Sequence, residues 1–158
     1  MSQLSASEER FRALVTATSD VVYRMSPDWS VMHELDGRGF LESTTVPITG
    51  WREKNVHPAD MDMVNAAINR AIAIKGIFEL EHRVVRTDGS TGWTVSRAVP
   101  IFDTDGEMIE WFGAASDVSL RKQAEVDLKL AKEEAEQQKR VYETVTSSTP
   151  DLITTYLG

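Results

Sequence analysis

Few side chains in this sequence could carry out chemistry. There is no Cys, and the three His residues, His33, His57 and His82, are widely spaced. The sequence has no glycine-rich phosphate-binding loop, no His-Glu-x-x-His motif and no nucleophile elbow. Because catalysis needs a nucleophile, a base and an orienting group close together, we predict that this chain is not an enzyme. Without Cys, a disulfide scaffold, a zinc finger and a thiolate nucleophile are excluded, and we expect no metal site.

His82 has the most informative surroundings of the three. In an extended segment it shares one face with Phe78 and Leu80. Two interpretations stay open: a His packed in the core, or a pocket residue that donates a pH-sensitive hydrogen bond. Trp93 is either a further pocket residue or one that fills a core or an interface. The candidate pocket residues are Phe78, Leu80, His82 and Trp93.

Spacing and turn residues predict an α+β fold around these candidates. We expect a helix over residues 1–19 and a second helix that starts at Pro58, oriented by His57, and runs to Lys75. Residue alternation and turn signals predict five strands, at residues 20–25, 29–35, 77–87, 91–102 and 108–118. Two strands, then helices, then a three-strand meander favour one antiparallel sheet with helices on one face.

The composition limits the size and the partners of this fold. With 158 residues, 41% of them hydrophobic and 27% charged, the chain suits one soluble domain and a short appendage. The net charge of −8 argues against nucleic-acid binding, which needs clustered positive charge. No apolar run approaches the roughly 20 residues that span a bilayer, and no N-terminal segment reads as a signal peptide. We therefore expect a cytoplasmic chain without nucleic-acid or membrane contacts.

A long helix is predicted after the domain, over residues 119–145. This segment holds six basic and six acidic residues and neither Gly nor Pro. Its small and apolar residues alternate at spacings of four and three, which is typical of a coiled-coil seam. The seam residues are Ala124, Leu128, Ala131, Ala135, Gln138, Tyr142 and Val145. The alternative is a lone solvated helix.

Two apolar surfaces have no expected partner within the chain. The N-terminal helix presents Phe11, Leu14 and Val15, and the long helix presents Leu128 and Tyr142 in its seam. A homodimer with symmetric contacts would bury both surfaces. These five residues are the candidate dimer-interface residues.

The end of the chain repeats the pattern of its beginning. Residues 11–22 align with residues 142–153, with matching aromatic, aliphatic, small polar and Asp positions. Such a repeat predicts a second copy of the domain. The expected boundaries are 1–19 for the N-terminal helix, 20–118 for the domain, 119–145 for the linker helix and 146–158 for the truncated start of a second domain.

Four motifs follow one another along the chain. They are SDVVYR at 19–24, Trp51 followed by VHPAD at 56–60, EHRVVRTDGSTGW at 81–93, and DVS at 117–119 followed by RKQAE at 121–125. Together they resemble the motifs of a PAS domain of the sensory-box type with an attached PAC segment, over about residues 8–125. The departures are Ala59, Ser119 and an unusual stretch at 40–50.

This resemblance implies a PAS-like fold and a function in signalling. The chain would be a sensory and dimerisation module of a bacterial protein with several PAS domains, and it would relay a signal through its C-terminal helix. The implied parent is a sensor histidine kinase, with further PAS domains and the output domain in the same polypeptide. The alternatives are a diguanylate cyclase parent, or a structural spacer or interaction module without a ligand.

The resemblance also implies where a signal leaves the domain. In this family the Asp at position 117 joins the last strand to the helix start, so Asp117, Ser119 and Arg121 are candidate signal-transfer residues. The alternative for Asp117 is an ordinary carboxylate near a helix N-terminus. No cofactor is expected, because the flavin photosensors of this fold need a Cys and the haem-binding members carry a His inside the long helix, whereas residues 61–75 hold none. An unidentified small-molecule ligand stays open.

Overall fold

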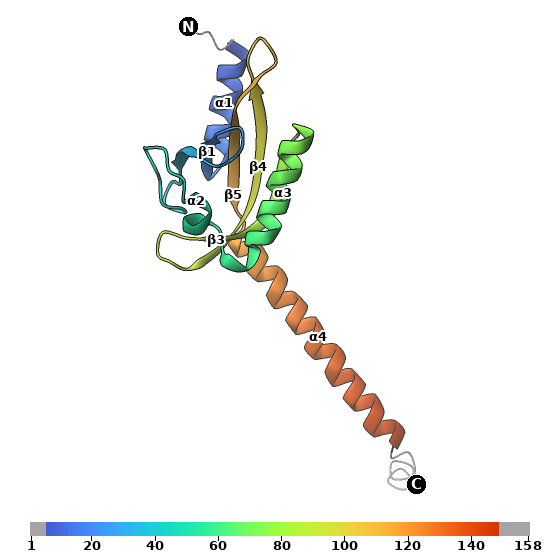
Figure 1. The fold of residues 1–158 in the computed structure, drawn as a ribbon. Helices are drawn as coiled ribbons and strands as arrows, with labels where there is room; N and C mark the ends of the chain where they lie inside the picture. The colour runs from blue at the N-terminus through green and yellow to red at the C-terminus, as the bar shows by residue number, and fades with distance from the viewer. Residues whose placement is uncertain (1–5, 149–158) are drawn as a thin grey trace, which may run out of the picture. The chain divides into compact units, whose positions relative to one another are not determined.

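The computed structural model describes residues 6–148 (Figure 1). The elements in chain order are α1 (Ala6–Thr18), β1 (Val21–Met25), β2 (Met32–Asp36), α2 (Trp51–Asn55), the short 3-10 helix η1 (Pro58–Asp60), α3 (Met61–Ile74), β3 (Phe78–Val85), β4 (Thr91–Phe102), β5 (Met108–Asp117) and α4 (Ser119–Ser148). The chain divides into two compact units between Ser119 and Leu120. Within the described residues, no helix has both the length and the apolar character needed to cross a membrane.

Five strands form one antiparallel sheet in the order β2-β1-β5-β4-β3. The β3–β4 and β4–β5 hairpins turn at Gly89 and Gly106, whose φ values of 84° and 83° suit glycine. In each turn an Asp side chain, Asp88 or Asp103, accepts a hydrogen bond from a backbone amide two residues later. The predicted α+β fold with a five-stranded antiparallel sheet is confirmed.

The inner face of the sheet carries the core. Helix α3 packs on this face through Val64, Ile68 and Ala71, which recur at helical spacing and are buried. It ends at Ile74 because Lys75 takes a left-handed conformation with φ 50°. The helices predicted to cover one face of the sheet correspond to α2, η1 and α3. These elements enclose the site described below.

Helix α1 lies against the opposite, outer face of the sheet. The guanidinium of Arg12 lies 5.1 Å from the ring centre of Phe112 and 3.4 Å from the Glu110 carboxylate, both of which belong to β5. Figure 1 shows α1 and α3 on opposite sides of the sheet. The outer face is therefore only partly covered within this chain.

Strand β2 starts later than expected, at Met32 instead of Trp29. Trp29 lies in the turn after β1 with a left-handed φ of 64°, which costs a non-glycine residue about 1–2 kcal/mol. Its side chain is 2% exposed and sits in the middle of the core. Burial of a large aromatic side chain outweighs that backbone cost.

Candidate functional site

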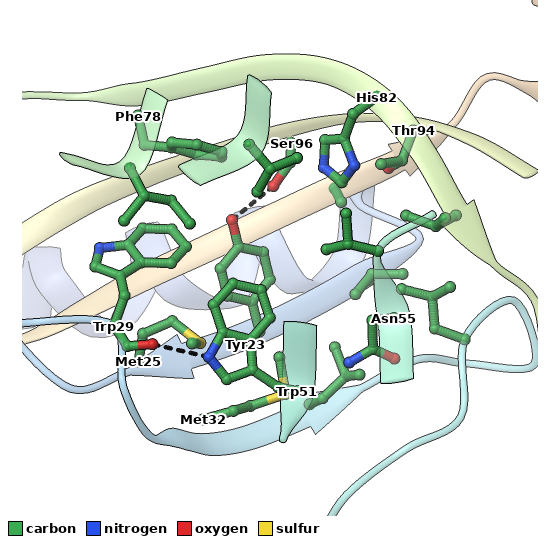
Figure 2. Close-up of a pocket in the computed structure, with 18 residues that line it drawn as sticks. Tyr23, Met25, Trp29, Met32, Trp51, Asn55, Phe78, His82, Thr94 and Ser96 are labelled. Atoms are coloured by element: carbon green, nitrogen blue, oxygen red, sulfur yellow. Dashed lines mark hydrogen bonds between the residues drawn. The ribbon is translucent and has the colours of Figure 1, made fainter. Parts of the chain in front are cut away.

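A cavity of about 60 Å³ lies between the inner face of the sheet and helices α2 and α3 (Figure 2). The side chains around it come from all five strands and from both helices, and most of them are apolar. At one end Trp29 packs tightly among other aromatic rings. Its ring centre lies 5.0 Å from that of Phe78, 5.6 Å from Trp111, 6.0 Å from Trp51 and 6.2 Å from Tyr23.

Two hydrogen bonds hold this aromatic cluster in place. The indole Nε1 of Trp51 donates to the backbone oxygen of Trp29 at 2.8 Å (Figure 2), and Trp111 Nε1 donates to the oxygen of Pro27 at 2.9 Å. Both acceptors lie in the turn between β1 and β2. The ring packing and these bonds together fix the turn that places Trp29 in the core.

The polar side chains that line the cavity are uncharged at neutral pH. The Tyr23 hydroxyl and the Ser96 hydroxyl share a buried hydrogen bond of 2.6 Å (Figure 2). Burial raises the pKa of Tyr23, and the bond to Ser96 offsets this only in part. Burial also lowers the pKa of His82, so its imidazole is neutral at pH 7.

Asn55 contributes a polar group without a partner to the lining. The residue is 6% exposed, and its Nδ2 donates to no acceptor in the described part of the chain. An unpaired buried donor costs about 1–3 kcal/mol. Figure 2 shows the amide nitrogen directed toward the other lining side chains, and the imidazole of His82 directed toward the same space.

The structure separates the four candidate pocket residues. Phe78 and His82 line the cavity, and Leu80 lies partly buried against the core without lining it. Trp93 does not line the cavity either, which corrects its expected placement. Its neighbours in β4, Thr94 and Ser96, face inward, so strand alternation turns Trp93 to the outer face.

On that outer face Trp93 pairs with Arg83 across strands β3 and β4. The guanidinium of Arg83 lies 5.6 Å from the Trp93 ring centre. Arg83 also binds the buried carboxylate of Asp60 through its Nη2 at 2.6 Å, its Nε at 3.1 Å and its backbone amide at 2.7 Å. Asp60 stands directly before α3, so these contacts join the start of α3 to β3 and β4.

Residues before Asp60 shape the start of α3. The Nδ1 of His57 accepts a hydrogen bond from the Ala59 amide at 3.1 Å, and the His57 amide donates to the oxygen of Arg83 at 3.2 Å. The expected role of His57 at a helix start is confirmed, since it caps η1. Neither the Asp60–Arg83 ion pair nor the unpaired Asn55 has a signal in the sequence beyond the motif that contains Asp60.

A second cluster of hydrogen bonds lies where β5 ends. Asp117 accepts a bond from the Ser119 amide at 2.9 Å, and its own amide donates to Asp20 Oδ2 at 2.8 Å. The Trp93 amide donates to Ser119 Oγ at 3.0 Å, and the Trp93 oxygen accepts from the Val118 amide at 2.9 Å. Residues 117–119 are thereby bonded to both the start of β1 and strand β4.

The remaining predicted residues lie on helices. Arg121 forms an ion pair with Glu125 one turn later in α4. On the same helix Leu128 and Tyr142 are 72% and 70% exposed. In α1, Leu14 is exposed and Val15 is half-buried. The side chain of Phe11 lies outside the described residues, and so do residues 149–158 of the expected second domain.

The sequence model of the PAS fold matches residues 42–115. This match covers β3, β4, most of β5 and the helices that enclose the cavity. The first unit of this chain is a PAS domain.

Solved structures with the same fold include several PAS domains. A sensory box histidine kinase/response regulator from Burkholderia thailandensis is 25% identical, with a TM-score of 0.64 over 81% of this chain and 98% of that structure. The PAS domain of a Colwellia psychrerythraea protein is 19% identical, with a TM-score of 0.57 over 73% and 98% of the two chains. The N-terminal domain of a diguanylate cyclase with PAS/PAC sensor from Marinobacter aquaeolei is 15% identical, with a TM-score of 0.55 over 65% and 97%. The last two likenesses concern the fold alone.

Among curated proteins, the chain is similar to the uncharacterized protein y4lL of Sinorhizobium fredii. The two are 26% identical over an alignment of 136 residues, and the match covers 83% of this chain. The matched region is 16% of the length of that relative.

Proposed function

We propose that this PAS domain is a sensory and dimerisation module of a signalling protein and that it relays a signal through α4. The parent in this proposal is a cytoplasmic sensor histidine kinase with further PAS domains and an output domain. The observation that carries the proposal is the set of hydrogen bonds at the exit of the sheet, where β5 ends. There Asp117 and Ser119 link β1 and β4 to the start of α4. The similarity to the sensory box histidine kinase/response regulator from Burkholderia thailandensis supports the choice of parent.

A continuous set of contacts leads from the cavity to this exit. Val64 and Ile68 of α3 line the cavity, and Asp60 stands at the start of the same helix. Asp60 binds Arg83, and Arg83 lies over the Trp93 ring. The Trp93 backbone in turn bonds to residues 118 and 119. A change in the cavity that moves α3 would reach the exit through these contacts, provided that they have two arrangements.

Dimerisation belongs to the same proposal. The exposed Leu14 on α1 and the exposed Leu128 and Tyr142 on α4 are apolar surfaces that a second copy would cover. Relay through a coiled-coil helix needs two helices whose register or separation can change. The homodimer would supply that second helix.

A structural spacer is the second candidate, and one observation favours it. The cavity of about 60 Å³ is small, because the domain's own aromatic side chains fill most of its interior. A domain filled by its own side chains could hold its neighbours apart without sensing anything.

A substitution that narrows the cavity distinguishes a sensor from a spacer. Val84 lines the cavity, so Val84→Ile adds a methyl group to the lining, at a cost in stability of no more than about 1–3 kcal/mol. In a sensor this change should reduce the response of the parent's output activity to its stimulus. Val95→Ile on the outer face of β4 is the control and should leave the response unchanged. An unchanged response in both variants would favour the spacer.

A further inference from the structure

The cavity lining includes a buried hydrogen-bond donor, Asn55 Nδ2, that has no acceptor among the described residues. Asn55 is the last residue of α2, and Val56 after it is held by a backbone bond to Arg52 and by a bridge to Val84. The backbone therefore keeps Asn55 facing inward, where it is 6% exposed. Trp29 Nε1 is also unpaired, but Figure 2 shows it on the side of the ring that points away from the cavity. Asn55 Nδ2 is thus a donor that an occupant could reach.

The other polar groups of the lining argue against a charged occupant. Tyr23 and Ser96 bond to each other, and His82 Nδ1 lies 3.1 Å from the oxygen of Arg83. The nearby charges of Asp60 and Arg83 neutralise each other in an ion pair. A buried ion without a counter-charge is strongly disfavoured. The occupant that fits is therefore neutral.

The volume sets an upper limit on the occupant's size. A dry cavity of about 150 Å³ lined by apolar side chains accommodates benzene, and a single water needs about 10–15 Å³. The cavity here measures about 60 Å³, less than half of that benzene cavity, so it accepts an occupant of up to about three non-hydrogen atoms. A single water would occupy no more than about a quarter of this volume, and most of the side chains around the rest are apolar.

We propose that the cavity binds a small neutral molecule with an apolar frame and one acceptor oxygen, which takes the hydrogen bond of Asn55 Nδ2. Dimethyl ether and the shortest aldehydes and alcohols belong to this class. The proposal rests on the proposed sensory function for its biological meaning, but the binding step itself is a property of this chain. Asn55 would select for the acceptor, and the surrounding apolar side chains would select for size.

Two probes of equal size test the role of Asn55. They are dimethyl ether, which has an acceptor oxygen, and propane, in which a methylene group replaces that oxygen. Both gases are dissolved under pressure, titrated into the ¹⁵N-labelled chain and followed by NMR, dimethyl ether up to tens of millimolar and propane up to its limit of solubility. We expect both probes to shift the amides of residues that line the cavity. The preference for dimethyl ether, taken as the ratio of the two Kd values, should fall about tenfold in Asn55→Leu.

The two probes are hydrated differently in water, but this difference is the same for every variant. It therefore cancels when the ratio of Kd values is compared between proteins. Asn69→Leu replaces an exposed Asn of α3 and is the matched control, which should keep the wild-type ratio. Asn55→Leu should fold, because it removes an unpaired buried polar group and keeps the size of the side chain. Val84→Ile should weaken the binding of both probes, which checks the location of binding independently of Asn55.

Several results would overturn the proposal. They are an unchanged ratio in Asn55→Leu, no effect of Val84→Ile, amide shifts confined to residues outside the cavity, or no binding of either probe in this range. These outcomes are seen on the purified chain. Failure of the relay would instead be seen in the parent's output while binding of the probes persists, so the two failures are distinguishable.

Discussion

The buried carboxylate of Asp60 links the start of α3 to strand β3. Hydrogen bonds from the Arg83 side chain hold the pKa of Asp60 below its usual range, although burial acts in the opposite direction. The folded state thus favours the ionised form more than the unfolded state does. The resulting stabilisation is complete above the ordinary pKa of aspartate and is lost as the pH falls through the lower folded value.

Replacing this carboxylate should therefore have an effect that depends on pH. Asp60→Asn should lower the free energy of unfolding by about 1–3 kcal/mol at neutral pH, because the charged hydrogen bonds to Arg83 are lost. The difference from wild type should shrink as the pH falls below about 4. Denaturant unfolding over a series of pH values measures it, with the exposed Asp62→Asn of α3 as the control. A difference that does not change with pH would contradict this account of Asp60.

The Tyr23–Ser96 hydrogen bond allows a second test within the cavity lining. Tyr23→Phe or Ser96→Ala alone leaves the other hydroxyl buried without its partner, and each should cost about 1–3 kcal/mol. The double variant should cost less than the sum of the two, because no hydroxyl of the pair is then left unpaired. Unfolding in denaturant gives all four values, and Tyr142→Phe, on an exposed side chain of α4, should have no effect. Strict additivity would mean that the bond contributes nothing.

At the scale of elements, local patterns predict the strands because alternation and turn chemistry are local properties. The turn residues at Asp88-Gly89 and Asp105-Gly106 predict both hairpins of the meander, and each Gly has the expected positive φ. The left-handed Trp29 has no local signal, since core packing outweighs its backbone preference.

The face of β4 could not be assigned from sequence for a specific reason. Its larger apolar residues, Trp93, Val95 and Val99, lie on the outer face, whereas the inner face carries the smaller Thr94 and Ser96. The inner residues are small because the rings of Tyr23 and Trp29 already fill the interior. Strand β5 also needs a small residue beside the Tyr23 ring, at Gly113. A Cβ there would lie 2.2 Å or less from carbon atoms of that ring. Burial depends here on residues distant in sequence, as do the Asp60–Arg83 pair and the unpaired Asn55.

Helix α4 carries its own test of the dimer proposal. Leu128 belongs to the seam, whereas Leu130 is also exposed but lies off the seam. Leu128→Lys should weaken dimerisation at least tenfold, because it places two positive charges in the seam of a symmetric dimer. Leu130→Lys makes the same change in amino-acid composition at a position off the seam, and it should leave the dimer unchanged. Light scattering over a range of concentrations measures both. A wild-type chain that stays monomeric at high concentration would refute the seam.

At the scale of the whole molecule, the chain consists of a PAS domain followed by a long helix. The sheet meets this helix at residues 117–119, which carry the bonds to β1 and β4 described above. If the domain relays a signal, the change must pass through these residues to reach α4. A pure spacer would need this junction only for stability. The two functions therefore differ in what the loss of the junction does to output.

The most direct test is the output activity of the parent protein with Asp117→Ala, paired with the unfolding free energy of this chain carrying the same change. The chain should stay folded and lose about 1–2 kcal/mol, because the hydrogen bond to the Ser119 amide is removed and the core is untouched. Asp105→Ala, in the exposed β4–β5 turn, is the control and should change neither quantity. The account predicts that output shifts and that its response to the stimulus changes in Asp117→Ala alone. Reduced stability with unchanged output and an unchanged response would show that Asp117 only caps the helix, and would contradict the relay.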